Sequence, residues 1–180
     1  MTKVSHVVLI LGTALLSLTA CGTSPSGQSG KEGQVGQELS PAGALFINRS
    51  GTSGLEAVTF ARLAATRTTN SAVRSFASSM IADLAPVNQQ LAALTQINKI
   101  TPPSEMDERH AMLLQQLQTL NGPAFDRAYL DGQLQELTML IQAFQKEADS
   151  GTDPRVRSFA QQNLPMLLQH LQKASTIVGL

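Results

Sequence analysis

Few side chains in this sequence could bind a metal ion. A di-iron centre in a helical bundle takes about four carboxylates and two histidines, with Glu-x-x-His pairs that share one helix face. The sequence has no Glu-x-x-His, and the nearest spacing is Asp107-x-x-His110, on a short segment between longer predicted helices. A metal site drawn from four helices would use Glu56, Asp83, Glu136 and His170. The shortage of ligands favours the alternative, in which the two glutamates lie on solvated faces and the other two side chains make local hydrogen bonds.

Asp126, Arg127 and Tyr129 form the most prominent polar cluster, near the start of a predicted helix. One interpretation is a patch at one end of a bundle that binds a small ligand or a partner. In the structural interpretation, Asp126 complements the helix dipole, Tyr129 buries its ring, and Arg127 stays in solvent or pairs nearby. Polar groups near helix starts usually cap or pair, so we favour the structural interpretation.

The sequence lacks the motifs of the common enzyme classes. It contains no Gly-x-Ser-x-Gly, no phosphate-binding Gly-x-x-x-x-Gly-Lys-Ser/Thr and no dinucleotide-binding Gly-x-Gly-x-x-Gly. Thirteen basic residues balance thirteen acidic ones, which argues against a nucleic-acid partner. The sequence therefore predicts no catalytic residues, no cofactor and no nucleic-acid binding.

The N-terminus indicates export and lipidation. Residues 7–16 form an apolar stretch too short for a permanent membrane-spanning helix. Leu18-Thr19-Ala20-Cys21 then resembles the cleavage box of bacterial lipoproteins. The resemblance implies removal of residues 1–20 and lipidation of Cys21, which would anchor the chain in a membrane. The alternative is an ordinary secretory signal, and it is weaker because the sole cysteine lies where lipidation needs a thiol.

A spacer and a folded part follow the predicted anchor. Gly22, rather than aspartate, comes after the cysteine, and this resembles sorting to the outer membrane with the protein facing the periplasm. Residues 21–40 are rich in Gly, Ser and Gln and have almost nothing to bury, which predicts a flexible linker. Residues 41–180 are predicted to form the folded domain.

The folded part shows helical spacing almost throughout. Apolar residues recur every three or four positions, and one such seam runs through Leu130, Leu134, Leu137, Ile141, Phe144 and Ala148. Gly51 and Gly54 are expected to interrupt the start of the first helix, with a short turn before them. A capping box at residues 104–107 predicts a short helix over about 105–120.

One pentapeptide occurs twice. Val73-Arg74-Ser75-Phe76-Ala77 recurs as Val156-Arg157-Ser158-Phe159-Ala160, each time just after a predicted helix start. The two copies predict two helical hairpins whose second helices begin alike, with both arginines on solvated flanks. Joined by a long connection that carries the short helix, the hairpins give an all-α, ferritin-like four-helix bundle.

Several segments resemble domain-of-unknown-function family 4142, a family of exported bacterial proteins with a ferritin-like helical domain. The resemblance covers about residues 42–176 and is carried most specifically by residues 125–129, Phe-Asp-Arg-Ala-Tyr, and by Leu164-Pro165 followed by His170. It implies a fold and an envelope location but no reaction. Relatives commonly place histidines where this chain has Leu84 and Leu137, which implies a dry bundle centre here.

These observations predict a lipid-anchored cell-envelope protein with a structural or interaction role and no enzymatic activity. The predicted partner is an unknown envelope protein or a glycan, since many glutamines, Gln133 among them, are expected on the polar helix faces. The alternative is a metal-binding ferritin-like protein with a role in redox chemistry or oxidative stress.

Overall fold

The computed structural model describes residues 39–101 and 106–179 of the 180-residue chain. They belong to one compact unit, Gly36–Leu180. The predicted export signal, the lipidation site Cys21 and most of the predicted linker lie outside the described residues. Leu39 packs against the hydrophobic core, and Ser40 caps the first helix through a 3.1 Å hydrogen bond from the Gly43 amide.

The described residues fold into helices joined by short turns and one longer connection. The helices are α1 Pro41–Arg67, α2 Ser71–Ile97, α3 Glu108–Thr119, α4 Gly122–Ser150 and α5 Pro154–Val178. None of the helices in this part of the chain combines the length and apolar character that a membrane-spanning segment requires.

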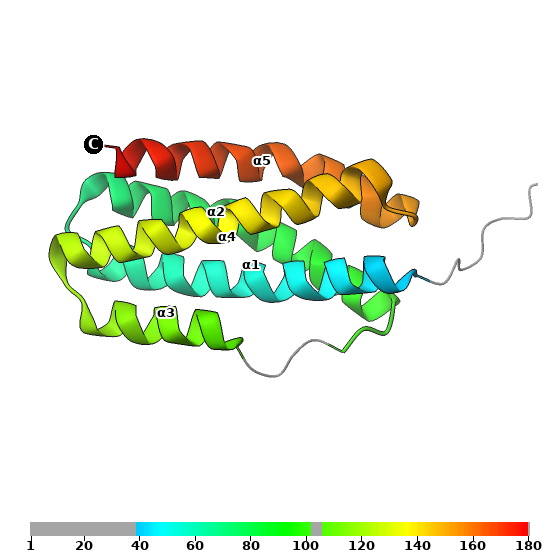
Figure 1. The fold of residues 1–180 in the computed structure, drawn as a ribbon, viewed down its shortest axis with the longest axis horizontal. Coiled ribbons are helices and arrows are strands. Elements are labelled where there is room, and N and C mark those ends of the chain that lie inside the picture. The colour runs from blue at the N-terminus through cyan, green and yellow to red at the C-terminus, as the bar shows by residue number, and fades with distance from the viewer. Residues whose placement is uncertain (1–38, 102–105, 180) are drawn as a thin grey trace, which may run out of the picture. The chain divides into compact units, whose positions relative to one another are not determined.

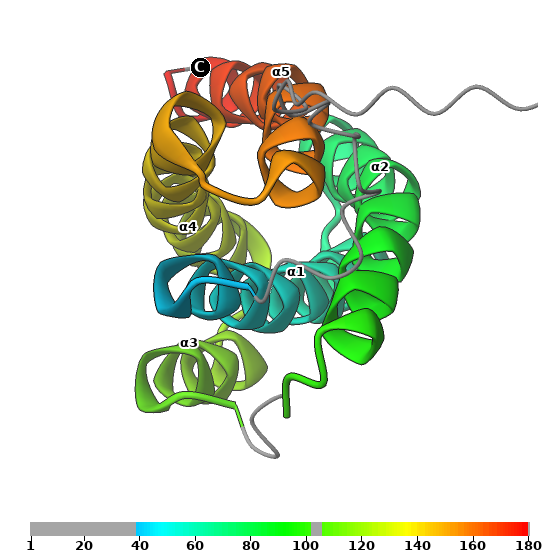
Figure 2. The ribbon, with the colours of Figure 1, turned by 90° about the vertical axis from the view of Figure 1, so that its right-hand side faces the viewer.

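Two antiparallel hairpins form the bundle (Figure 1). Helix α1 pairs with α2, and α4 pairs with α5. Seen end-on in Figure 2, α1 also borders α4 and α2 borders α5, so α1 lies diagonal to α5 and α2 diagonal to α4. The chain returns along the bundle through α3, so α2 and α4 run in the same direction (Figure 1). This topology confirms the ferritin-like bundle with a short helix in its crossover.

The predicted interior seams form the core. Leu84 of α2 and Leu137 of α4 are both buried, as expected from the dry bundle centre. At one end, three phenylalanines from three helices pack together with ring centroids 5.0–6.4 Å apart: Phe46 lies edge to face on Phe144 and Phe159, and the latter two are tilted to each other. This geometry suits aromatic rings in a close-packed interior.

The repeated pentapeptide occupies equivalent positions in the two hairpins. Phe76 and Phe159 are buried, and each copy follows a side-chain cap, Asn70 or Asp153. The arginines do not simply extend into solvent as predicted. Arg74 donates to the carbonyl of Thr68, and an Arg157 Nη donates to the carbonyl of Gly151 at 2.7 Å.

Each repeat arginine therefore binds the turn that precedes its own helix. In both cases the acceptor lies six residues earlier, where the preceding helix has just ended and its last carbonyls lack helical partners. The pentapeptide thus contributes an arginine that hydrogen-bonds to the hairpin turn, as well as a buried Phe-Ala pair.

The first helix is longer than predicted. Helix α1 runs without a break through Gly51 and Gly54, and the expected turn near Ala44 is helical. Gly54 is buried against the Asn88 side chain of α2, where an added Cβ would lie 2.1 Å from Asn88 Oδ1. This glycine permits close approach of two helices, and the packing outweighs its low helix propensity.

The short helix begins later than predicted. Helix α3 starts at Glu108, and the side chain of Asp107 caps it by accepting a 2.9 Å hydrogen bond from the His110 amide. The predicted capping box is therefore wrong in register, and residues 102–105 lie outside the described part. Leu113 of α3 lies against Gly132 of α4, where the missing Cβ lets the two helices approach closely.

The Leu137→Asp substitution tests the heptad seam. Leu137 is 1% exposed, so an aspartate there would bury a charge without a partner. We expect the free energy of unfolding, measured by urea denaturation, to fall by about 3–5 kcal/mol. Thr138→Asp, at the exposed neighbouring position, should change it by less than about 0.5 kcal/mol. Equal stabilities of the two variants would contradict the register.

Candidate functional site

His110 is the centre of the most unusual polar cluster in the described residues. Although α3 lies outside the four-helix bundle (Figure 2), His110 points inward and is only 1% exposed. Its ring stacks on Phe60 of α1, with centroids 5.9 Å apart. Around it lie Glu56 of α1, Glu136 of α4 and its own helix cap, Asp107. We call these four residues the His110 centre.

The end of α3 is fixed by Arg67, the last residue of α1. Its guanidinium donates to the carbonyls of Leu117, Gln118 and Leu120 at 2.9–3.1 Å and to Asn121 Oδ1 at 2.8 Å. These bonds satisfy carbonyls at the C-terminus of α3, where no helical donors follow. Arg67 thereby holds α3 against α1 and helps to position His110.

One side of the His110 ring faces Glu136. The Nε2 atom lies 3.0 Å from Glu136 Oε2 in hydrogen-bond geometry. The same oxygen accepts a 2.6 Å bond from Arg109, and Ser53 donates to this carboxyl as well. Burial alone would raise the pKa of Glu136, but the bonds from His110, Ser53 and Arg109 lower it to about 2. Glu136 is therefore an ionised acceptor for Nε2–H.

The other side of the ring faces two further carboxylates. The Nδ1 atom lies 2.8 Å from both Glu56 Oε2 and Asp107 Oδ2. Neither contact has hydrogen-bond geometry at Nδ1, and both carboxylate oxygens of Glu56 are buried without a hydrogen-bond donor. The side chains of His110, Glu56 and Asp107 thus lie close together, but Nδ1 and both Glu56 oxygens have no hydrogen-bond partner in the described part of the chain.

The pKa shifts follow from this arrangement. Burial disfavours the charged imidazolium, but the contacts with Glu136 and Asp107 outweigh it, so the pKa of His110 is raised. Burial likewise raises the pKa of Glu56, although the neighbouring His110 opposes this shift. The centre favours a positive charge at Nδ1, whether a proton or another cation.

The predicted solvated positions of Glu56 and Glu136 are wrong, because both are 5% exposed. The four-residue metal set does not form one site either. Glu56 and Glu136 meet at His110, whereas Asp83 pairs with His170, Oδ2 to Nε2, at 3.1 Å. Glu56 and Glu136 are buried because α3 covers this face of α1 and α4. The spacing of residues within each helix does not predict that a further helix lies there. The one available signal was the Asp107-x-x-His110 pair.

His170 of α5 lies inside the bundle. It is 1% exposed and contacts Phe76 edge to face, with centroids 6.0 Å apart. Burial, assisted by the charge of Lys173, lowers its pKa against the opposing attraction of Asp83. This histidine is therefore held mainly in its neutral form, in contrast to His110.

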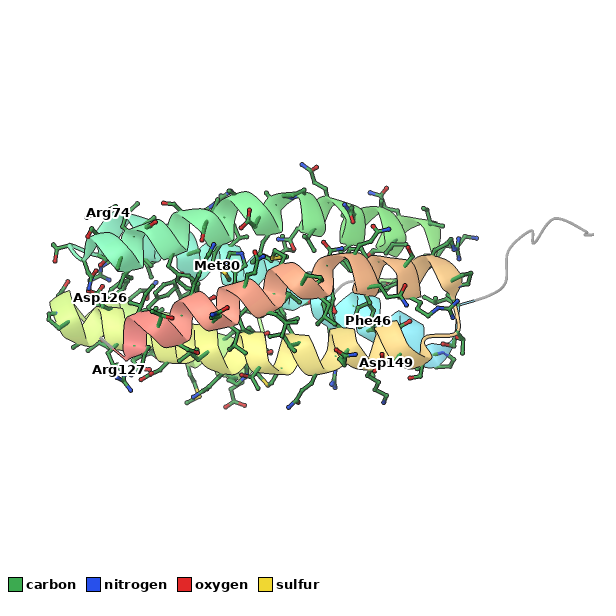
Figure 3. All side chains as sticks on the ribbon, turned by 90° about the horizontal axis from the view of Figure 1, so that it is seen from above. Phe46, Arg74, Met80, Asp126, Arg127 and Asp149 are labelled. Atoms are coloured by element: carbon green, nitrogen blue, oxygen red, sulfur yellow. The ribbon has the colours of Figure 1, made fainter. Side chains whose placement is uncertain are left out.

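The polar cluster of α4 divides into separate structural roles. Asp126 accepts a 2.5 Å hydrogen bond from the Thr68 hydroxyl and so joins α4 to the α1–α2 turn. Arg127 points away from the bundle (Figure 3) and pairs with Asp131 at 2.9 Å. Tyr129 is buried beside Phe76, and burial raises its pKa. The three side chains do not converge on one ligand site.

Gln133 is a further exception to the expected pattern. This glutamine of α4 was expected on a polar face, but it is 1% exposed, and both its amide atoms lack a hydrogen-bond partner. Gln133 lies one helical turn before Leu137, which belongs to the predicted apolar seam. The spacing of apolar residues alone does not show that a glutamine at this position is buried.

A groove runs beside the His110 centre. It has a volume of about 740 Å³ and lies between the N-terminal half of α1 and the C-terminal half of α4. Asp107, Arg109 and Glu136 form one end, while Leu45, Met139 and Ala143 contribute apolar walls. Leu45 and Met139 are 52% and 43% exposed. A second cavity, of about 500 Å³, lies between α1 and α2 and is lined by Glu56.

The described residues form an all-α bundle of two helical hairpins, and the carboxylates and histidines in the described part of its interior do not make up the ligand set of a di-iron centre. The chain belongs to the family described as "Domain of unknown function (DUF4142)", whose model matches residues 29–177. No curated protein matches the chain.

A solved structure shares the fold. It is a DUF305 fragment from Deinococcus radiodurans, with a TM-score of 0.70 and 17% sequence identity. The match covers 78% of this chain and 97% of the fragment. At this identity the similarity shows the fold alone, so function must be argued from the side chains of this chain.

Burial of neutral His170 predicts a pH-dependent stability. Because its pKa is lowered on folding, the unfolded chain binds a proton more readily below about pH 6.5. The contribution of His170 to the free energy of unfolding is thus full above pH 6.5 and is lost as the pH falls toward the folded-state pKa. His170→Gln should flatten this loss in urea titrations between pH 7.5 and 5. If the free energy of unfolding depends on pH equally in the parent and in His170→Gln, the prediction is contradicted, since His110 is present in both proteins.

Proposed function

We propose that this chain is a lipid-anchored cell-envelope protein that binds another protein through the α1–α4 groove and catalyses no reaction. The groove is the observation that carries this proposal. It combines apolar walls from Leu45 and Met139 with a charged end at Arg109 and Glu136, and its lining also includes Arg49, Lys146 and Glu147. A surface of this kind suits recognition of a partner, since apolar contacts supply affinity and the charged end supplies orientation.

The bundle's own α3 indicates what kind of partner fits. Helix α3 is amphipathic and packs Leu113, Leu114 and Leu117 toward the bundle, while its other face is exposed. With 12 residues it is about 18 Å long, whereas the 27-residue α1 is about 40 Å long. The groove occupies the part of the α1–α4 face beyond the start of α3. We therefore propose an amphipathic helix of a partner protein as the occupant.

A glycan fits the groove less well than a helix does. Glycan sites rely on exposed aromatic faces, whereas the exposed apolar side chains of the groove are Leu45 and Met139, and Phe46, the aromatic residue of its lining, is only 7% exposed. In addition, Gln133, one of the glutamines expected on the polar helix faces, is buried. These observations favour a protein partner over the glycan alternative.

The anchor supplies the location for this binding. The proposed lipid at Cys21 and the spacer up to residue 38 would hold the bundle close to the periplasmic face of a membrane, with the outer membrane as the proposed site. Membrane attachment would confine the search for a partner to the same surface and raise its effective concentration. A metal-binding role is the second candidate and rests on the His110 centre.

Cys21→Ser tests the anchor. Without the thiol the chain cannot be lipidated, so we expect it to move from the membrane fraction to the soluble periplasmic fraction. Fractionation followed by immunoblotting, with labelled palmitate as a second readout, measures both effects. Retention in the membrane fraction together with undiminished palmitate labelling would contradict the proposal.

The groove is tested by Met139→Glu. We place a photo-crosslinking residue at the exposed, groove-lining position of Ala143 and expect one discrete protein adduct in intact cells. A glutamate at position 139 buries a charge on binding and should reduce this adduct at least about tenfold, equivalent to about 1.4 kcal/mol.

Leu168→Glu is the matched control. Leu168 is similarly exposed, at 47%, but lies on α5 and outside the groove. Its variant should retain the adduct. Equal loss in both variants, equal retention in both, or the lack of any protein adduct at position 143 would contradict the groove as the binding site.

A further inference from the structure

We propose that Glu56, Asp107 and His110 form a binding site for one divalent transition-metal ion, with Glu136 as the residue that orients the imidazole. This site differs from the four-residue set considered from the sequence and lies outside the four-helix core, between α1, α3 and α4. It is independent of the partner-binding groove, so either proposal can fail without the other.

The spacing of the donor atoms suits a metal ion. One donor atom from each residue lies within 4.8 Å of the other two. His110 Nδ1 is 2.8 Å from an oxygen of Glu56 and from an oxygen of Asp107. Nitrogen and oxygen ligands lie about 2.0–2.2 Å from such ions, so adjacent ligands in six-coordinate geometry are about 2.8–3.1 Å apart. The two distances from Nδ1 already match this spacing, and the oxygens of Glu56 and Asp107 lie within 4.8 Å of each other.

The donors are also poorly satisfied by the protein itself. Both oxygens of Glu56 and the Nδ1 atom of His110 are buried and have no hydrogen-bond partner among the described residues. Buried polar atoms without partners are unfavourable and need an explanation. A cation between them would pair with all three at once.

Glu136 has the position of a supporting carboxylate. Histidines that bind metals almost always donate their second ring N–H to a carboxylate, carbonyl or water, which fixes the tautomer. Here Nε2 bonds to Glu136 at 3.0 Å, so Nδ1 faces Glu56 and Asp107 and presents its lone pair to them once an ion displaces its proton. Arg109 binds Glu136 in turn, at 2.6 Å, and fixes the position of this carboxylate.

The site is open to solvent at Asp107. Asp107 has a side chain that is 55% exposed and borders the groove, while Glu56 lines the second cavity between α1 and α2. One imidazole nitrogen and two carboxylates suit first-row ions such as Zn²⁺ and Mn²⁺, with water completing the coordination. The site would also link α3 to α1 through the bound ion.

The test uses Zn²⁺ and Mn²⁺ with the full chain purified in detergent and carrying Cys21→Ser, which removes the sole thiol. We expect calorimetry with Zn²⁺, and electron paramagnetic resonance with Mn²⁺, to show one saturable site per chain. Glu56→Gln and Asp107→Asn should each weaken binding at least about tenfold, and Glu136→Gln about 10–100-fold. His170→Gln, which alters the other buried histidine, should bind as the parent does.

Asp107→Asn keeps the test decisive if Glu56→Gln fails to fold. Asparagine caps helices as well as aspartate does, so this variant retains α3 while losing a charged ligand. Circular dichroism confirms the fold of each variant. The proposal is overturned if the parent binds neither ion at one site per chain, if Asp107→Asn binds as tightly as the parent, or if His170→Gln loses binding equally.

Discussion

His110 lies between carboxylates from three helices, and this buried contact couples the crossover helix to the bundle. A charged group leaves water at a high cost in free energy unless partners of opposite charge surround it. Glu136, held by Arg109 and Ser53, supplies one partner, and Glu56 and Asp107 supply the others. The burial of Glu56 and Glu136 in turn depends on α3 lying over them. The burial of these charged groups therefore depends on their mutual contacts.

This coupling gives the two faces of the molecule different characters. The interior between the hairpins is mainly apolar, with Leu84 and Leu137 buried and His170 held mainly neutral. The α1–α4 face carries the groove and the His110 centre, in which Glu56 and the Nδ1 atom of His110 lack hydrogen-bond partners among the described residues. In ferritin-like bundles the metal-binding side chains project into the bundle centre. Here the glutamates that converge on His110 lie beneath the crossover helix α3. The proposed partner groove and the proposed ion site share this face.

The sequence predicts most of the architecture because the architecture depends on local patterns. Heptad spacing identifies the seam through Leu137, and caps such as Asn70 and Asp153 mark helix starts. The duplicated pentapeptide predicts the two hairpins. Local patterns do not predict features that depend on packing between helices. Gly54, for example, lies within α1, where it packs against Asn88 of α2.

The candidate site is less predictable for the same reason. The burial of Glu56 and Glu136 depends on where α3 docks, and nothing in the periodicity of α1 or α4 reveals that a third helix covers them. Asp107 and His110 share a helix face by spacing, but their glutamate partners lie 26 or more residues away along the chain. A long-range arrangement of this kind requires the folded structure.

The protonation and ion binding of the His110 ring can be measured directly. Nitrogen-15 NMR of the imidazole reports which ring nitrogen carries a proton and whether a cation is bound. The account predicts a protonated, hydrogen-bonded Nε2 and an Nδ1 resonance that shifts on addition of one equivalent of Zn²⁺, while the His170 resonances stay constant. A His110 ring with the chemical shifts and titration of a solvent-exposed histidine, unaffected by Zn²⁺, would contradict it.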